Sequence, residues 1–451
     1  MQKRLGLVET NLSGQIMQMI TRHFIDVPQG AGKRRVHYRK CGSGPALLMV
    51  HQSPRSSKEY EVLMREWGAH FTCIAADSPG FGQSDPLPPE PSINDFADAN
   101  IALLDALGLN RVHAYGFHSG GIILVTALKR NPERFNCMAV GGYAIWTADE
   151  MHIFGESYLP PFHPQPYGEH LVWLWARILE QTWVFPWFDV RDATRLPFPT
   201  DDPAKIHPVV MEMLDSGDAY RAGYGAVLKA PRDIPPVDTI TPPVLISAYH
   251  GDPLQAHIDR LGDMPMGWEA AKVDTAEAHQ ALSLAFLLRT PGEPIGPLPE
   301  AGEAGFVHIT TDKFEGLIHW HDNAVDPPGH GLSDGWRGAA SNDWAHWQAV
   351  FEVFEAATGK PVVLPPIPKG DPDLLYPDLT PDRFGAYLTK AWSISRAAAL
   401  FEPWYEVSAA NALTIDAARL SPEALAIDTR DRLRARAAKA LHIARLTKGD
   451  C

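Results

Sequence analysis

The sequence has few cysteines and no long apolar run, and both absences limit what the protein can be. Its four cysteines, Cys41, Cys73, Cys137 and Cys451, are far apart and form no C-x-x-C pair. This argues against a disulfide framework and against a cysteine zinc site. No apolar run approaches the ~18 residues of a membrane-spanning helix, and residues 1–20 lack an apolar segment with a small-residue cleavage site. We therefore expect a cytoplasmic protein that does not bind a membrane.

An excess of positive charge is also missing. The formal net charge is −14 at pH 7 over 451 residues, which argues against nucleic acid as a partner. Apolar residues make up 45% of the chain and charged residues 21%, as in a soluble globular enzyme with a substantial core. The length allows about two or three domains.

Strand-like and helix-like patterns alternate from residue 22 onward. Residues 24–39 have the alternating faces of a β-hairpin, and residues 46–51 and 71–77 are continuous apolar runs typical of buried parallel strands. Residues 93–109 repeat apolar side chains every three to four positions, as an amphipathic helix does. Repeated β–α alternation predicts an α/β fold with a mostly parallel sheet covered by helices.

The alternation stops at residues 147–235, which are rich in Trp, Phe and Pro, and returns at residues 241–254. An aromatic helical insertion between two sheet segments predicts a cap over the carboxyl edge of the sheet. We therefore assign residues 1–146 and 236–290 to a core and residues 147–235 to the cap.

Several motifs in a fixed order resemble the α/β-hydrolase superfamily. They are VHQSPRSS (50–57), DSPGFGQSD (77–85), YGFHSGG (115–121), YHGDPL (249–254) and EAHQAL (277–282). The family pattern is a strand ending in H-G, a D-x-P-G-x-G-x-S loop, a nucleophile elbow, a cap, a late Asp and a late His. The resemblance covers roughly residues 22–290 and implies the α/β-hydrolase fold.

The elbow is one residue out of step with the usual G-x-S-x-G motif. If Ser119 were the nucleophile, Phe117 would stand where only a small residue fits. With His118 at the tip, Gly116 and the two following glycines occupy the positions that must be small. We therefore expect His118 at the nucleophile position, where the family has Ser, Cys or Asp, and keep Ser119 as the conventional alternative.

The resemblance also implies roles for two later residues. Asp252 matches the family's acid and His279 its base, so we expect Asp252 to orient His279 and His279 to move protons.

The family's oxyanion hole implies backbone N–H donors near Ser53 and at Ser119. The H-G pair has become His51-Gln52, so Gln52 belongs to the candidate loop. Arg55 follows closely and either binds an anionic substrate or pairs with an acidic neighbour.

Beyond a Pro/Gly/Glu linker (291–304), the earlier motifs recur. DPPGHGLSD (326–334) echoes residues 77–85, and GAYLTKAWSISRAAALFEPWYE (385–406) echoes residues 168–189 at a constant offset of 217. The copy lacks an elbow and the late Asp and His. We interpret residues 305–451 as a degenerate, non-catalytic repeat of the hairpin and cap elements that covers core surface, shapes the pocket or builds a dimer contact.

Two reactions fit a histidine at the elbow. The first is hydrolysis of an ester, amide or C–C bond of a small apolar or aromatic substrate, with His118 as nucleophile or as base on water. The second is non-hydrolytic lyase, retro-aldol or retro-Claisen chemistry by acid–base catalysis. A metal site of His118, His279 and Asp252 is a weaker alternative, as is a binding protein without activity. We expect a small-molecule substrate, no cofactor, no metal and a homodimer as one option.

Overall fold

The computed structural model describes residues 9–10, 16–154, 157–231, 233–299, 304–321 and 324–448. The chain divides into two compact units. The first unit comprises Met1–Pro161, Leu179–Thr200 and Glu212–Ala301, and the second comprises Phe162–Ile178, Asp201–Met211 and Gly302–Cys451. Parts of the segment predicted as a cap therefore group with the C-terminal residues. Cys451 and residues 300–303 of the predicted linker lie outside the described residues.

An eight-stranded sheet forms the centre of the first unit, in the order β10-β9-β8-β7-β5-β6-β4-β3. Strands β5 to β10 pair in parallel, whereas β3 and β4 form an antiparallel hairpin and β4 pairs antiparallel with β6. The strands are β3 (Thr21–Gln29), β4 (Gly32–Cys41), β5 (Ala46–Val50), β6 (Thr72–Ala76), β7 (Val112–Phe117), β8 (Phe135–Gly141), β9 (Val244–Tyr249) and β10 (Trp268–Val273). The predicted α/β fold with a mostly parallel sheet and an N-terminal hairpin is confirmed.

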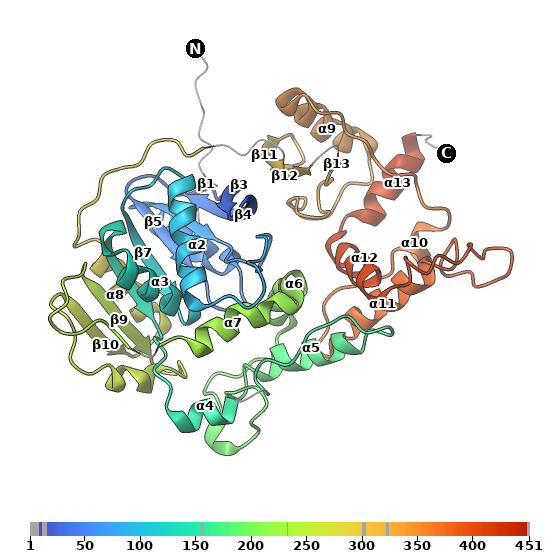
Figure 1. The fold of residues 1–451 in the computed structure, drawn as a ribbon. Helices are drawn as coiled ribbons and strands as arrows, with labels where there is room; N and C mark the ends of the chain where they lie inside the picture. The colour runs from blue at the N-terminus through green and yellow to red at the C-terminus, as the bar shows by residue number, and fades with distance from the viewer. Residues whose placement is uncertain are drawn as a thin grey trace, which may run out of the picture. The chain divides into compact units, whose positions relative to one another are not determined.

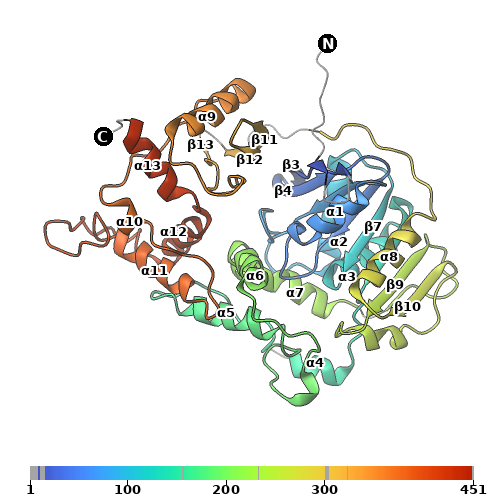
Figure 2. The same ribbon diagram turned by 180° about the vertical axis from the view of Figure 1, so that it is seen from behind.

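Both faces of this sheet are covered, which explains the continuous apolar runs. Leu48 and Val50 of β5 face a core that includes α2 (Ile93–Ala106) and α3 (Ser119–Arg130). The alternate residues Leu47 and Met49 face a second core with α1 (Glu61–Trp67) and α8 (Ala276–Leu287). Helices α2 and α3 cross one face in Figure 1, and α1 and α8 lie on the opposite face in Figure 2.

The residues predicted as a cap fold mainly as helices. These are α4 (Ala148–Phe154), α5 (Glu169–Glu180), α6 (Pro203–Ser216) and α7 (Tyr220–Lys229). In the first unit, Trp146 contacts Phe154 edge-on at 4.7 Å between ring centroids, and Val184 and Arg195 form an isolated β-bridge. Phe154 also contacts Tyr158 and Phe185, at 4.9 Å and 6.0 Å between ring centroids.

The second unit holds an antiparallel sheet and a set of helices. Its strands are β11 (Ala304–Thr310), β12 (Glu315–His321) and β13 (Ala324–Val325), and its helices are α9 (Trp344–Thr358), α10 (Pro372–Leu375), α11 (Ala386–Ala398), α12 (Pro422–Arg434) and α13 (Ala438–Lys448). Trp347 of α9 is fully buried against Ala437 and Leu441, so the basic C-terminal helix packs one face into this core. In the residue range of the first unit, a separate two-stranded sheet joins β1 (Glu9–Thr10) to β2 (Ile16–Met17).

Candidate active site

The tip of the elbow is His118. It is the single residue between the end of β7 at Phe117 and the start of α3 at Ser119, with φ +49° and ψ −115°. A positive φ is uncommon for a residue with a side chain, and such strain is concentrated at functional sites. The register predicted from the glycines is therefore the one in the structure.

The glycines around the tip have no room for a side chain. A Cβ on Gly120 would lie 1.9 Å from the carbonyl oxygen of Val50, and a Cβ on Gly116 would lie 2.8 Å from the carbonyl carbon of Gly120. Phe117, in contrast, stacks on the His118 ring at 4.2 Å between centroids. The strand and helix are thus so close that small residues are required at Gly116 and Gly120, two positions before and two positions after His118. Counted from Ser119, one of these positions would be Phe117.

His118 pairs with Asp252. Its Nε2 lies 3.0 Å from Oδ1 of Asp252, whose side chain is fully buried, while the His118 side chain stays 24% exposed. Oδ1 also accepts the backbone N–H of Leu254 at 2.8 Å. Although burial by itself raises the pKa of Asp252, His118 and its hydrogen bond hold that pKa below the usual value. An ionised carboxylate therefore faces Nε2 of His118, and it favours the tautomer that has its proton on Nε2 and its lone pair on Nδ1.

His279 does not take the place expected for it beside Asp252, so the predicted Asp252–His279 hydrogen bond is wrong. It lies in the first turn of α8, buried, with Nδ1 2.9 Å from Oγ of Ser247 and Nε2 3.1 Å from the hydroxyl of Tyr115. The physical reason is that α8 begins at Ala276 and places His279 against Ser247 of β9 and Tyr115 of β7. Since both ring nitrogens have protein partners, the three side chains do not form a shared ligand set.

Ser119 and Ser53 come together at the predicted oxyanion position. The backbone N–H of Ser53 donates to Oγ of Ser119 at 2.6 Å, and Oγ of Ser119 donates to Oγ of Ser53 at 3.3 Å. The hydroxyl of Ser119 therefore accepts the Ser53 N–H that the sequence analysis predicts as an oxyanion donor.

Gln52 and Arg55 are held by acidic side chains. The backbone N–H of Gln52 donates to Glu59 at 2.9 Å and its side-chain amide to the same carboxylate at 3.2 Å. Nε of Arg55 donates to Glu212 at 2.6 Å. Of the two roles that the sequence leaves open for Arg55, pairing with an acidic neighbour is present in the structure, and a role of Gln52 or Arg55 in substrate binding stays a prediction.

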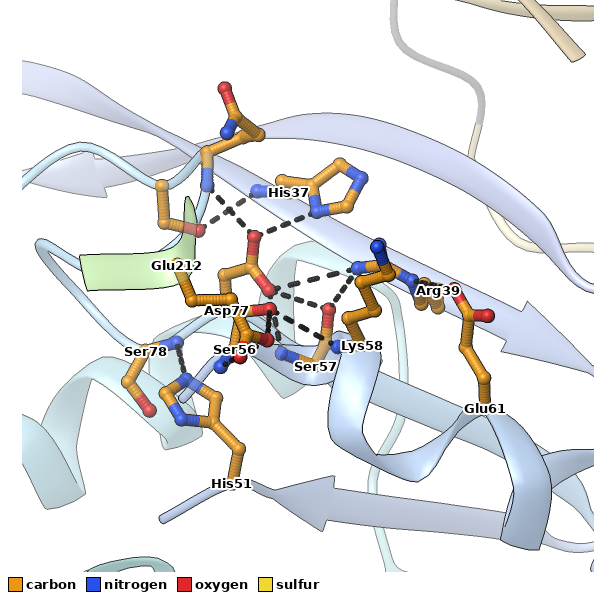
Figure 3. A network of polar contacts seen from close by, with 12 residues as sticks. His37, Arg39, His51, Ser56, Ser57, Lys58, Glu61, Asp77, Ser78 and Glu212 are labelled. Carbon is orange, nitrogen blue, oxygen red and sulfur yellow. Dashed lines mark hydrogen bonds and ion pairs between the residues drawn. The ribbon is translucent and has the colours of Figure 1, made fainter. Parts of the chain in front are cut away.

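A buried network of hydrogen bonds centred on Asp77 holds the loop of residues 51–57 in place (Figure 3). Asp77 accepts hydrogen bonds from the Ser57 backbone at 2.8 Å, the Ser57 hydroxyl at 2.5 Å and the Gln83 backbone at 2.8 Å, and pairs with Nδ1 of His37 at 2.8 Å. Nε2 of His51 accepts the N–H of Ser78 at 2.8 Å. The DSPGFGQSD motif thus positions the loop that carries Ser53.

Gly142 is a site residue that the motif analysis missed. A Cβ there would lie 2.3 Å from Cδ2 and 2.6 Å from Nε2 of His118, and 2.8 Å from Oδ2 of Asp252. Its neighbour Gly141 approaches His279 in the same way, at 2.8 Å from Cε1. The only sequence signal is the pair of adjacent glycines, Gly141 and Gly142, which indicates a close approach without identifying what approaches.

Replacing Gly142 by Ala should disrupt the His118–Asp252 pair. The new methyl group would overlap both side chains, so we expect a loss of about 1–3 kcal/mol in the free energy of unfolding beyond the cost of the backbone conformation. Gly30→Ala is the matched control, because Gly30 has the same φ of +57° and nothing within 4 Å of its Cβ position. Urea unfolding of both variants measures the difference, and equal losses would contradict the close contact.

Two buried histidines near the site make its stability depend on pH. Burial lowers the pKa of His279 to about 4 and that of His257, whose Nδ1 accepts the N–H of Ile145 at 2.9 Å, also to about 4. Between the unfolded value of about 6.5 and about 4, the unfolded chain binds protons that the folded chain does not. The free energy of unfolding should therefore be highest above pH 6.5 and fall as the pH is lowered toward 4. In His279→Gln the slope of unfolding midpoints over this range should become shallower, and an unchanged slope would contradict the assignment.

Every helix in the part of the chain that the structure describes is too short or too polar to span a lipid bilayer. Within the same residues, no group of three or more His, Cys, Asp or Glu side chains is placed to hold a metal ion.

Comparison with known proteins gives a family match over the elbow region. Residues 45–155 match the family model described as alpha/beta hydrolase fold. The chain is 29% identical over 136 residues to a 2-hydroxy-6-oxononadienedioate/2-hydroxy-6-oxononatrienedioate hydrolase of Dechloromonas aromatica, covering 29% of this chain and 47% of the relative. It is 30% identical over 143 residues to haloalkane dehalogenase 2 of Mycobacterium bovis, covering 31% of this chain and 49% of the relative. The chain thus spans about half the length of these curated relatives.

Epoxide hydrolase A from Mycobacterium thermoresistibile aligns with a TM-score of 0.47 at 15% identity, over 60% of this chain and 100% of that chain.

Proposed function

We propose, from the premise that this chain belongs through residues 45–155 to the α/β-hydrolase superfamily, that it hydrolyses a small apolar or aromatic substrate. In this proposal His118 takes the place of the usual elbow nucleophile and Asp252 orients it. The observation that carries the proposal is the 3.0 Å contact between Nε2 of His118 and Oδ1 of Asp252 at the elbow tip.

The chemistry follows from the tautomer that Asp252 selects. With Nε2–H donated to the carboxylate, Nδ1 of His118 carries the lone pair and needs no further base to become reactive. Nδ1 accepts a proton from water while the water oxygen bonds to the electrophilic carbon of the substrate. The imidazolium, stabilised by the Asp252 carboxylate, then returns that proton to the leaving group. Direct attack of Nδ1 on an acyl carbon, followed by hydrolysis of the acyl-imidazole, uses the same geometry.

The relatives support a small substrate. One is named as a hydrolase of 2-hydroxy-6-oxononadienedioate and another as a haloalkane dehalogenase. The aromatic residues of the cap segment, such as Phe154 and Tyr158, are consistent with an apolar substrate.

Asp252→Asn tests the proposal. The amide can no longer hold the ionic pair with Nε2–H, so the base function of Nδ1 should be lost and kcat/KM should fall by about 10²–10⁴. The measurement is turnover of three probes, 2-hydroxy-6-oxononadienedioate, 1-chlorobutane and p-nitrophenyl acetate. Asp274→Asn, at an exposed carboxylate after β10, is the control and should leave turnover unchanged. Equal turnover of both variants would contradict the proposal.

One observation favours a second candidate, acid–base cleavage without hydrolysis. The N–H of Ser53 already donates to Oγ of Ser119 at 2.6 Å, so a tetrahedral oxyanion would have to displace that hydroxyl. A proton-transfer reaction by His118 forms no such intermediate. Turnover in H₂¹⁸O separates the two candidates, since hydrolysis places one solvent oxygen in a product and a lyase reaction places none.

A further inference from the structure

The cap segment and the C-terminal region repeat the same hydrogen bonds at the sequence offset of 217. In the first, the N–H of Leu196 donates to the carbonyl of Trp183 at 2.8 Å, and in the second, the N–H of Leu413 donates to the carbonyl of Leu400 at 2.8 Å. A second pair of backbone bonds repeats in the same way, from the N–H of Phe185 to the carbonyl of Thr194 (2.9 Å) and from the N–H of Glu402 to the carbonyl of Asn411 (3.0 Å). The indole N–H of Trp187 donates to the carbonyl of Tyr158 (3.4 Å), and that of Trp404 donates to the carbonyl of Leu375 (3.2 Å). The sequence echo therefore corresponds to two copies of one local structure.

The hairpin and its following loop are also repeated. Nδ1 of His37 lies 2.8 Å from Asp77, and Nδ1 of His319 lies 2.8 Å from Asp326. A glycine with a positive φ lies next to the carboxylate in both places. Gly82 (φ +53°) lies against Asp77, and Gly331 (φ +50°) lies against Asp326. The copies thus share the hairpin, the acidic loop and the cap element.

Within the second unit the two cap copies meet reciprocally. A Cβ on Gly168, at the start of α5, would lie 2.9 Å from Cγ of Trp392. A Cβ on Gly385, at the start of α11, would lie 2.3 Å from Cγ of Trp175. Gly168 corresponds to Gly385 and Trp175 to Trp392, so each glycine contacts the tryptophan of the other copy. Figures 1 and 2 both show α5 and α11 side by side.

Such a reciprocal contact is the defining feature of an interface between two equal partners related by a two-fold axis. The contact is also well covered, since Trp392 is 1% and Trp175 4% exposed, with Leu171 and Leu388 at 1% and 0%. The indole Nε1–H of Trp392 and a guanidinium N–H of Arg396 both donate to the carbonyl of Pro166, at 3.4 Å and 3.2 Å.

We infer that the C-terminal copy is a tethered partner subunit for the cap. The face of residues 162–178 that carries Gly168, Leu171 and Trp175 fits a second copy of the same helix, and α11 of the same chain occupies it. The loss of the elbow from the copy is consistent with this role, because a partner for the cap needs the cap elements and not the reaction site. The inference does not depend on the proposed hydrolysis.

The first test is to cut the tether. A protease site inserted between Ala301 and Gly302 of the full chain separates the copies covalently once the folded protein is cleaved. We expect the two fragments to elute together in gel filtration, because residues 162–178 and 201–211 belong to the same compact unit as the C-terminal residues. Elution as two separate fragments would overturn the inference.

The second test uses the reciprocity. In the cleaved protein, Gly385→Ala should weaken fragment association about 10- to 100-fold more than Gly359→Ala does. Gly359 is the matched control, with the same φ of +69° and nothing within 4 Å of its Cβ position. An effect no larger than that of the control would overturn the inference.

Double-mutant cycles separate this interface from a general loss of stability. Trp392→Leu should couple to Gly168→Ala by about 5-fold or more in the dissociation constant, and Trp175→Leu should couple equally to Gly385→Ala. The same-copy combinations, Gly168→Ala with Trp175→Leu and Gly385→Ala with Trp392→Leu, should be additive within about 2-fold. Coupling within a copy as strong as coupling between copies would contradict the two-fold arrangement.

Discussion

Replacing His118 by Asn should lower kcat/KM by about 10²–10⁴, whereas Ser119→Ala should leave most of the activity. Asn is chosen because it tolerates the positive φ of +49° at the tip. Its amide can still donate a hydrogen bond to Asp252 but carries no basic nitrogen. The loss would therefore reflect the missing base, with the elbow and the buried carboxylate kept in place.

The Ser119→Ala variant supplies the opposite control. It removes the hydroxyl that accepts the Ser53 N–H at 2.6 Å, so it frees that donor and leaves the His118–Asp252 pair intact. Circular dichroism of both variants confirms folding, and ¹⁵N-edited NMR of the wild type should find the proton on Nε2 of His118. Full activity in His118→Asn together with none in Ser119→Ala would identify Ser119 as a conventional nucleophile and refute the proposal.

The largest effect on stability should come from Asp77→Ala. The Asp77 side chain is 1% exposed and pairs with His37, which is equally buried, and its removal leaves several buried donors without an acceptor. The expected loss is about 3–5 kcal/mol in the free energy of unfolding, as for other broken buried ion pairs. Asp326→Ala is the matched control, because this carboxylate has the same histidine contact but is 23% exposed.

The Asp77 carboxylate also predicts acid sensitivity. Burial by itself raises its pKa, but His37 and Arg39 hold that pKa well below the usual range. A lowered pKa contributes stability that is present above the unfolded value of about 3.9 and is lost as the pH falls further. Hydrogen exchange of β4 and β12, followed separately in urea, measures the two variants. Similar losses in Asp77→Ala and Asp326→Ala would contradict the dependence on burial.

Much of the fold could be predicted because its signals are local. The strand at residues 46–50 is a continuous apolar run since both of its faces are covered, and the hairpin alternates because of its pairing. The repeat was also visible from the sequence, because corresponding residues retain similar side chains. Gly142 was missed for the opposite reason. Its importance depends on contacts with His118 and Asp252, which lie far from it in the sequence.

The sequence by itself determined which residue occupies the elbow tip. The pattern of small residues around the tip is visible in the sequence as Gly116, Gly120 and Gly121, although two of these glycines are confined by Val50 and Val140 of neighbouring strands. Which histidine meets Asp252 was decided only by the tertiary structure. The start of α8 at Ala276 places His279 against Ser247 and Tyr115, and His118 is the ring left within hydrogen-bonding distance of the carboxylate. Which histidine contacts Asp252 depends on the relative positions of the elbow, the loop after β9 and the start of α8. These segments are far apart in the sequence, so no local pattern encodes their positions.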